Sequence, residues 1–107
     1  MSKQLLTQNL EATLQNPEQP VVLDFYADWC GPCRMQGPLF AQAEAALQGQ
    51  AEFVKVDIER QPELAARFGV MSIPTIVVVK GGQTRWRNVG VTGKDEIVSA
   101  VRQAIAG

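Results

Sequence analysis

The chain has 107 residues, a formal net charge of −1, and 46% hydrophobic against 20% charged residues. This length and balance are typical of one folded domain and exclude a disordered segment. The basic residues form no stripe suited to a phosphate backbone, so we expect no nucleic-acid partner. Because no signal sequence and no run of about 18 apolar residues is found, we expect a cytoplasmic protein without a membrane segment. The chain contains no histidine, which excludes imidazole as a base or metal ligand.

The N-terminal segment allows two interpretations. Leu6, Leu10 and Leu14 recur with helical spacing, which predicts a helix that ends near Asn16-Pro17. A short strand at residues 4–6 is the alternative.

A strand, a helix and a second strand follow. Residues 21–27, VVLDFYA, are β-branched and aromatic and predict a buried strand, and residues 53–58, FVKVDI, predict the next one. The intervening helix of about 15 residues is closed by Gly49 and is expected to kink at Pro38. Its predicted core stripe has a four-residue spacing, with Arg34, Gln36, Gln42 and Gln48 off the stripe and Met35, Leu39, Ala43 and Leu47 on it. This order of elements predicts a right-handed parallel crossover in an α/β domain.

The second half predicts a short helix, a hairpin and a last helix. Residues 62–68 form the short helix, which starts at Pro62 and is closed by Gly69. Residues 75–80 and 84–89 are two antiparallel strands joined around Gly81-Gly82. Thr92 with Asp95 predicts a capping box for the last helix. The predicted buried face of that helix comprises Ile97, Val98, Val101 and Ile105.

The second hairpin strand carries an unusual triplet. Alternation places Trp86 on one face and Arg85 with Arg87 on the other. This is typical of a soluble edge strand with one packed aromatic residue, and a contact with a partner is the alternative.

Both cysteines of the chain lie in ADWCGPCRM, residues 27–35. Cys30 lies where a strand ends and a helix begins, and the free N–H groups of a helix start stabilise a thiolate. Cys33 lies one turn further, close enough to form a ring with Cys30. This arrangement predicts a redox site in which Cys30 attacks a substrate disulfide and Cys33 resolves the mixed disulfide.

Two structural interpretations of the cysteine pair are disfavoured. A structural disulfide across so short a loop removes little chain entropy, and a cytoplasmic compartment keeps it reduced. A zinc site needs four ligands, which one cysteine pair without histidine supplies only if subunits share the metal. We therefore predict no metal and no cofactor besides the redox-active disulfide.

A Cys-X-X-Cys pair beside a strand–helix–strand unit is a known signal of thioredoxin-like chemistry. The stretch VVLDFYADWCGPCRM, with the later VMSIPT, resembles the thioredoxin family, and the predicted elements match that family along essentially the whole chain. The resemblance implies one domain over residues 1–107 with the thioredoxin fold: a central mixed sheet of about five strands, flanked by about four helices in three α/β/α layers. It implies a monomeric general reductase of protein disulfides, recharged by a thioredoxin reductase.

The resemblance also implies roles for two charged residues. Asp24 lies in the first strand, where burial is expected to raise its pKa, and the matching family residue lies behind the resolving thiol, where it would take the proton of Cys33. Lys55 matches a family lysine that faces this aspartate and modulates its charge. The alternatives are a structural aspartate and an ordinary solvated lysine.

Further matches imply a surface for substrates. Trp29 is an exposed aromatic residue, with core packing as its alternative. Ile73-Pro74 is expected to be cis beside Cys30, where the backbone of residue 73 pairs with the substrate; a plain turn proline is the alternative. Gly90 and Val91 would complete the apolar groove, although that glycine alone would indicate only a turn.

Gly31 and Pro32, between the thiols, affect redox direction. In the family, Gly-Pro goes with reductases, whereas a histidine beside the second cysteine goes with oxidases and isomerases. Many family members carry other residues at Tyr26 and at Met71-Ser72. These differences bear on which substrates bind and not on the chemistry. Two other functions remain open: an oxidase or isomerase, and a binding module or complex subunit that uses the same face without turnover.

Overall fold

A computed structural model describes residues 3–4 and 10–107. The strands are β1 (Lys3–Gln4), β2 (Val21–Tyr26), β3 (Glu52–Asp57), β4 (Thr75–Lys80) and β5 (Gln83–Val89), and the helices are α1 (Leu10–Leu14), α2 (Gly31–Ala46), α3 (Pro62–Arg67) and α4 (Lys94–Ala106). Four strands have six or seven residues, and β1 has two. Within the described residues, no helix has the length and apolarity needed to cross a membrane.

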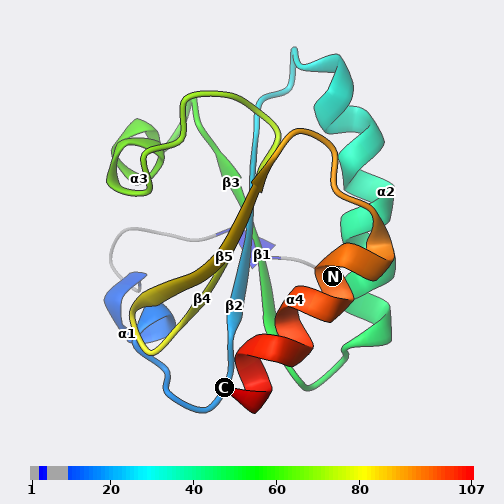
Figure 1. Ribbon diagram of the computed structural model, residues 1–107. Helices are drawn as coiled ribbons and strands as arrows, with labels where there is room; N and C mark the ends of the chain where they lie inside the picture. The colour runs from blue at the N-terminus through cyan, green and yellow to red at the C-terminus, as the bar shows by residue number, and fades with distance from the viewer. Residues whose placement is uncertain (1–2, 5–9) are drawn as a thin grey trace.

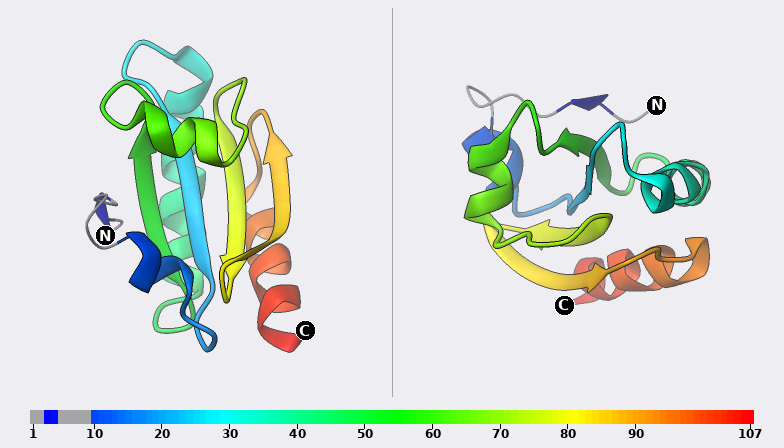
Figure 2. Two further views of the ribbon diagram at one scale, coloured as in Figure 1. Left: turned by 90° about the vertical axis from the view of Figure 1, so that its left-hand side faces the viewer. Right: turned by 90° about the horizontal axis from the view of Figure 1, so that it is seen from above.

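The strands form one mixed sheet in the order β1-β3-β2-β4-β5. β3 runs parallel to both β1 and β2, whereas β4 is antiparallel to β2 and β5. Helices α2 and α4 cover one face of the sheet and α1 and α3 cover the other, so the chain forms three layers (Figure 1; Figure 2). The parallel pairing of β2 and β3 and the antiparallel hairpin are therefore confirmed. At the hairpin turn Gly81 and Gly82 have φ of 59° and 81°, a conformation that favours glycine.

The sheet separates two apolar cores. Val22 of β2 packs with Phe40 of α2 and Ile97 of α4 in one core. Its neighbours Val21 and Leu23 pack in the other, under α1 and α3. Because both faces are covered, the central strands are continuous apolar runs. The alternation also sends the side chain of Asp24, two residues after Val22, toward the α2 side.

The buried face of α2 differs from the predicted stripe. The buried side chains have spacings of three and four residues and are Cys33, Gln36, Phe40 and Ala43, followed by Leu47 at the C-cap. A strict four-residue spacing drifts off a helix with 3.6 residues per turn. The prediction was therefore wrong for Met35, which is 66% exposed, and for Gln36, which is buried although it was placed off the stripe. The helix runs through Pro38 without ending.

The start and end of α4 also differ from prediction. Its N-cap is Gly93, without a side-chain cap, so the capping box at Thr92 was wrong. The Thr92 hydroxyl instead accepts a hydrogen bond from Asn88 Nδ2 at 2.9 Å. Ile105 is 39% exposed, and the last buried position is Ala104. The final turn therefore presents a smaller side chain to the sheet than predicted.

The N-terminal segment contains both a short strand and a helix, so each of the two predicted alternatives is partly correct. β1 is a short strand and α1 is a helix that ends with buried Leu14, while Leu6 lies outside the described residues. α1 also holds the hairpin turn, because Gly82 N–H donates to the Leu14 carbonyl at 2.7 Å.

The strict alternation predicted for β5 is interrupted by a β-bulge. Val78 pairs with Trp86 but the next residue, Val79, pairs with Thr84, which inserts Arg85 as an extra residue. Trp86 packs against the core under α2 and α4. Arg85 donates to the Gly107 carbonyl after α4, whereas Arg87 donates to the Phe68 carbonyl after α3. The two arginines thus bond to opposite helical layers, which corrects the prediction that they share a face.

The corrected face of α2 can be tested by a pair of truncations. Phe40→Ala should lower the free energy of unfolding by about 3–5 kcal/mol because it empties a packed core site. Met35→Ala should change it by less than about 0.5 kcal/mol. Urea denaturation followed by circular dichroism measures both, and equal losses would contradict the assigned face.

Candidate redox site

The two cysteines lie at the junction of β2 and α2. Cys30 is the N-cap of α2, and Pro32 occupies the first turn, where a missing N–H has no cost. Cys30 and Cys33 form a disulfide with a Cα–Cα distance of 5.3 Å. The Cys33 main-chain N–H donates to Cys30 Sγ at 3.2 Å. The two sulfur atoms are therefore placed to form a disulfide, and the helix start directs an N–H group at the first sulfur.

Two loops meet the cysteine turn at the same end of the sheet, the upper end in Figure 1. The Ile73-Pro74 bond before β4 is cis, and the Ile73 carbonyl oxygen lies 3.9 Å from Cys30 Sγ. Gly90, after β5, donates its N–H to the Pro74 carbonyl at 2.8 Å. Its φ of 96° is one that residues with a Cβ rarely adopt. The structure thus brings Cys30, Ile73-Pro74 and Gly90 together.

Large apolar side chains are exposed in the chain segments that adjoin Cys30, Ile73 and Gly90. Trp29 is 65% exposed, which excludes core packing as its role, and Val91 and Met71 are also exposed. Gly31 and Pro32, which separate the two cysteines in the sequence, are exposed as well. Exposed large apolar side chains around a site are typical of a surface that binds another protein.

Asp24 is 1% exposed, in the centre of β2. Burial raises its pKa from about 3.8 to about 6, and the nearby positive charge of Lys55 opposes part of the rise. Oδ1 of Asp24 has no hydrogen-bond partner in the part of the chain that the structure describes. A carboxyl group in this environment accepts or releases a proton near neutral pH.

Lys55 is the register partner of Asp24 on β3. Its Nζ lies 4.6 Å from the centre of the Tyr26 ring, a cation–π contact. A hollow of about 320 Å³ opens beside it, lined by Tyr26, Ala27, Asp28, Cys33, Arg34, Gly37 and Lys55. Cys33 and Lys55 therefore face one solvent-accessible hollow.

Two polar residues that the sequence analysis did not select belong to this end of the molecule. The fully buried Gln36 side chain forms two hydrogen bonds with the main chain of Thr92. The signal was available, because Gln36 lies between Cys33 and Phe40 at helical spacing. Arg87 donates to the carbonyls of Phe68 and Gly69, which precede the loop to Ile73.

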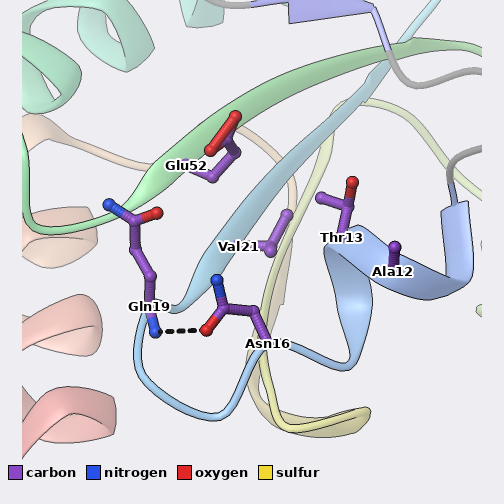
Figure 3. Close-up of a pocket in the computed structure, with 6 residues that line it drawn as sticks. All are labelled: Ala12, Thr13, Asn16, Gln19, Val21 and Glu52. Atoms are coloured by element: carbon purple, nitrogen blue, oxygen red, sulfur yellow. Dashed lines mark hydrogen bonds between the residues drawn. The ribbon is translucent and has the colours of Figure 1, made fainter.

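Another hollow, of about 240 Å³, lies at the opposite end of β2 and β3 (Figure 3). It is lined by Ala12, Thr13, Asn16, Gln19, Val21 and Glu52, and the Gln19 main-chain N–H donates to Asn16 Oδ1 at 3.2 Å. It contains no cysteine and therefore no redox group. Across residues 3–4 and 10–107, no group of three or more His, Cys, Asp or Glu residues is placed to hold a metal ion.

Comparisons with known proteins agree with this geometry. The family model described as Thioredoxin matches residues 1–103. Thioredoxin 1 of Chlorobaculum tepidum is 39% identical over 100 residues, covering 94% of this chain and 99% of the relative. The thioredoxin of Haemophilus influenzae is 34% identical over 97 residues, covering 91% of each chain.

Solved structures give the same result for the fold. A chloroplastic thioredoxin z superposes with a TM-score of 0.84 at 27% identity, covering 100% of this chain and 96% of that chain. A mutant thioredoxin from Halobacterium salinarum gives a TM-score of 0.82 at 30% identity, covering 97% of this chain and 89% of that chain.

The Trp-Cys-Gly-Pro-Cys turn, the cis proline beside it and these matches lead to one assignment. The chain belongs to the thioredoxin family, and it is a thiol-disulfide oxidoreductase that reduces protein disulfides through the Cys30–Cys33 pair.

Proposed function

We propose that Cys30 is the attacking nucleophile and Cys33 the resolving thiol. The Cys30 thiolate attacks one sulfur of a substrate disulfide, forming a mixed disulfide and expelling the other substrate sulfur as a thiolate. The Cys33 thiolate then attacks Cys30 Sγ, which forms the Cys30–Cys33 disulfide and releases the second substrate sulfur. The substrate gains two electrons and two protons, and the protein loses them.

The observation that carries this assignment is the hydrogen bond from Cys33 N–H to Cys30 Sγ. A donor directed at one sulfur favours its thiolate form, and the start of α2 adds positive potential. Exposure does not distinguish the two cysteines, since both are buried. Their neighbours do: Cys30 lies beside the Ile73 carbonyl, and Cys33 lines the hollow with Lys55.

Asp24 serves as the proton acceptor for Cys33 in the second step, and Lys55 modulates its charge. Support comes from the position of Asp24 on the α2 side of β2 and from its raised pKa. Cys33 and Lys55 line the same hollow, which supports a role of Lys55 near the resolving thiol.

Substrate proteins bind across the exposed end of the sheet. The main chain of Ile73 pairs with an extended substrate segment as a short added strand. The remaining contacts come from Trp29, Gly31, Pro32, Pro74, Gly90 and Val91. The exposed apolar side chains and the proximity of residue 73 to Cys30 support this surface.

The cycle needs a supply of electrons. We propose that the chain acts as a monomeric single domain over residues 1–107, in the cytoplasm, and that a thioredoxin reductase recharges it without a further cofactor in this chain. Family membership and the reductase chemistry support this setting, because the disulfide left after each turnover has to be reduced before the next.

The order of attack predicts opposite behaviour of the two cysteine variants. Cys33→Ser should accumulate a covalent complex with a disulfide-containing substrate because nothing resolves the mixed disulfide. Cys30→Ser should form none and should have no reductase activity. Non-reducing electrophoresis and mass spectrometry detect the complex. Trapping by Cys30→Ser instead would reverse the roles, and activity in Cys30→Ser would support the binding-module alternative.

Removing the buried carboxyl group should stabilise the protein in a pH-dependent way. Because folding raises the pKa of Asp24 to about 6, the contribution of its proton to stability is fully present below about pH 4 and lost as pH rises through about 6. The free energy of unfolding of Asp24→Asn minus that of the parent protein should therefore be about 3 kcal/mol larger at pH 8 than at pH 4. Urea titrations at both pH values measure this, with the exposed Asp28→Asn as control. A pH-independent effect would refute the burial argument.

The same substitution should slow one chemical step. In Asp24→Asn, resolution of the mixed disulfide should fall by at least about tenfold at pH 7, because the base is lost. In the parent protein, resolution should slow as pH falls through about 6, where Asp24 becomes protonated. Rapid-quench kinetics separate this step from the initial attack, which serves as internal control. Equal slowing of both steps would argue against a proton acceptor for Cys33.

A further inference from the structure

An amide side chain connects the active-site helix to the loop after β5. Gln36 of α2 is fully buried. Its Nε2 donates to the Thr92 carbonyl at 2.9 Å, and its Oε1 accepts from the Thr92 N–H at 2.7 Å. One side chain thus pairs with both main-chain groups of a residue 56 positions away, as a neighbouring strand would.

The hydrogen bonds continue from Thr92 toward the disulfide. The Thr92 hydroxyl accepts from Asn88 Nδ2 at 2.9 Å and lies 3.4 Å from the Gly90 carbonyl, to which it donates. Gly90 N–H donates in turn to the Pro74 carbonyl at 2.8 Å. A continuous series of contacts therefore runs from α2 through Thr92 and Gly90 to the cis proline.

Gln36 is placed where this series can affect substrate binding. It lies three residues after Cys33 on the same buried face of α2, so the helix turn that carries the resolving cysteine also holds residues 90–92. We propose that Gln36 is a positioning residue that fixes Gly90 and Val91 relative to the disulfide and so sets the affinity for protein substrates. This inference rests on the proposed role of Gly90 and Val91 in substrate binding.

The main chain of Thr92 depends on the Gln36 amide for its hydrogen bonds. Thr92 is fully buried, and buried N–H and C=O groups need partners. Without the Gln36 amide, both groups have to reach water, which requires the loop of residues 90–92 to move. The hydrogen bonds of the Gln36 side chain go to Thr92 and not to a sulfur atom, so its loss should affect docking rather than sulfur chemistry.

Gln36→Met tests this, because methionine has a similar length and shape but no hydrogen-bonding amide. With dithiothreitol as reductant and insulin as the protein disulfide, KM should rise about tenfold while kcat stays within about twofold. The rate with 5,5′-dithiobis(2-nitrobenzoate), a small disulfide that needs no docking surface, should stay within about twofold. Equal losses with both substrates, or no change in KM, would overturn the proposal.

Two further variants separate the possible causes. Leu47→Ala, at the far end of α2, removes a fully buried side chain and should lower stability without changing KM for insulin. Val91→Asp should raise KM for insulin if the loop binds substrate. An unchanged KM in Val91→Asp would refute the proposed substrate surface itself, whereas a raised KM there with an unchanged KM in Gln36→Met would refute only the role of Gln36.

Hydrogen exchange tests the contact in the parent protein, so the proposal does not depend on the folding of a variant. The Thr92 amide should exchange at least about a hundredfold more slowly than in an unstructured peptide, because its N–H is buried and bonded to Gln36. Exchange at the unprotected rate would overturn the proposal.

Discussion

β2 is bonded on both edges and covered on both faces, and each part of the redox site depends on its position. It pairs with β3 on one side and β4 on the other, and its side chains enter both cores. The strand leads directly to the cysteine turn, and its centre carries Asp24. Near its end, Phe25 is the register partner of Thr75, which follows the cis proline. A strand held this firmly gives the cysteine turn a rigid base.

The site combines two electrostatic environments over a short length of chain. At Cys30, the helix start and the Cys33 N–H favour negative charge on sulfur. Behind them, the buried position of Asp24 disfavours negative charge on oxygen. Lys55 moderates the second environment from the adjacent strand. In the mechanism proposed above, negative charge passes between sulfur atoms while a proton moves to the buried carboxyl group, and the two opposed preferences favour these two transfers.

The sequence was sufficient for the architecture because its signals were local. The strand at residues 21–27, the helix after Cys33 and the Gly81-Gly82 turn follow from periodicity and turn chemistry, and the resemblance supplied the cis bond at Pro74. The α2 stripe was wrong for a local reason, the strict four-residue spacing, but two other errors arose where a tertiary contact overrides a local pattern. Thr92 looked like a cap, but its main chain is paired with Gln36, 56 positions away. Arg85 looked like part of an alternating strand, but a register shift against β4 inserts it as a bulge. Both errors depend on how separate elements meet, which no local pattern reveals.

That bulge affects how the molecule meets other copies of itself. β5 forms one edge of the sheet, and a regular edge strand offers its free backbone groups to any extended chain nearby. The extra residue at Arg85 breaks the even spacing of these groups, and the exposed arginines on either side of Trp86 bring positive charge to the same edge. A second molecule approaching β5 in register would place like charges together. Both features disfavour edge-to-edge pairing of β5 with a second copy. In the function proposed above, strand addition takes place at the loop of Ile73, beside the disulfide.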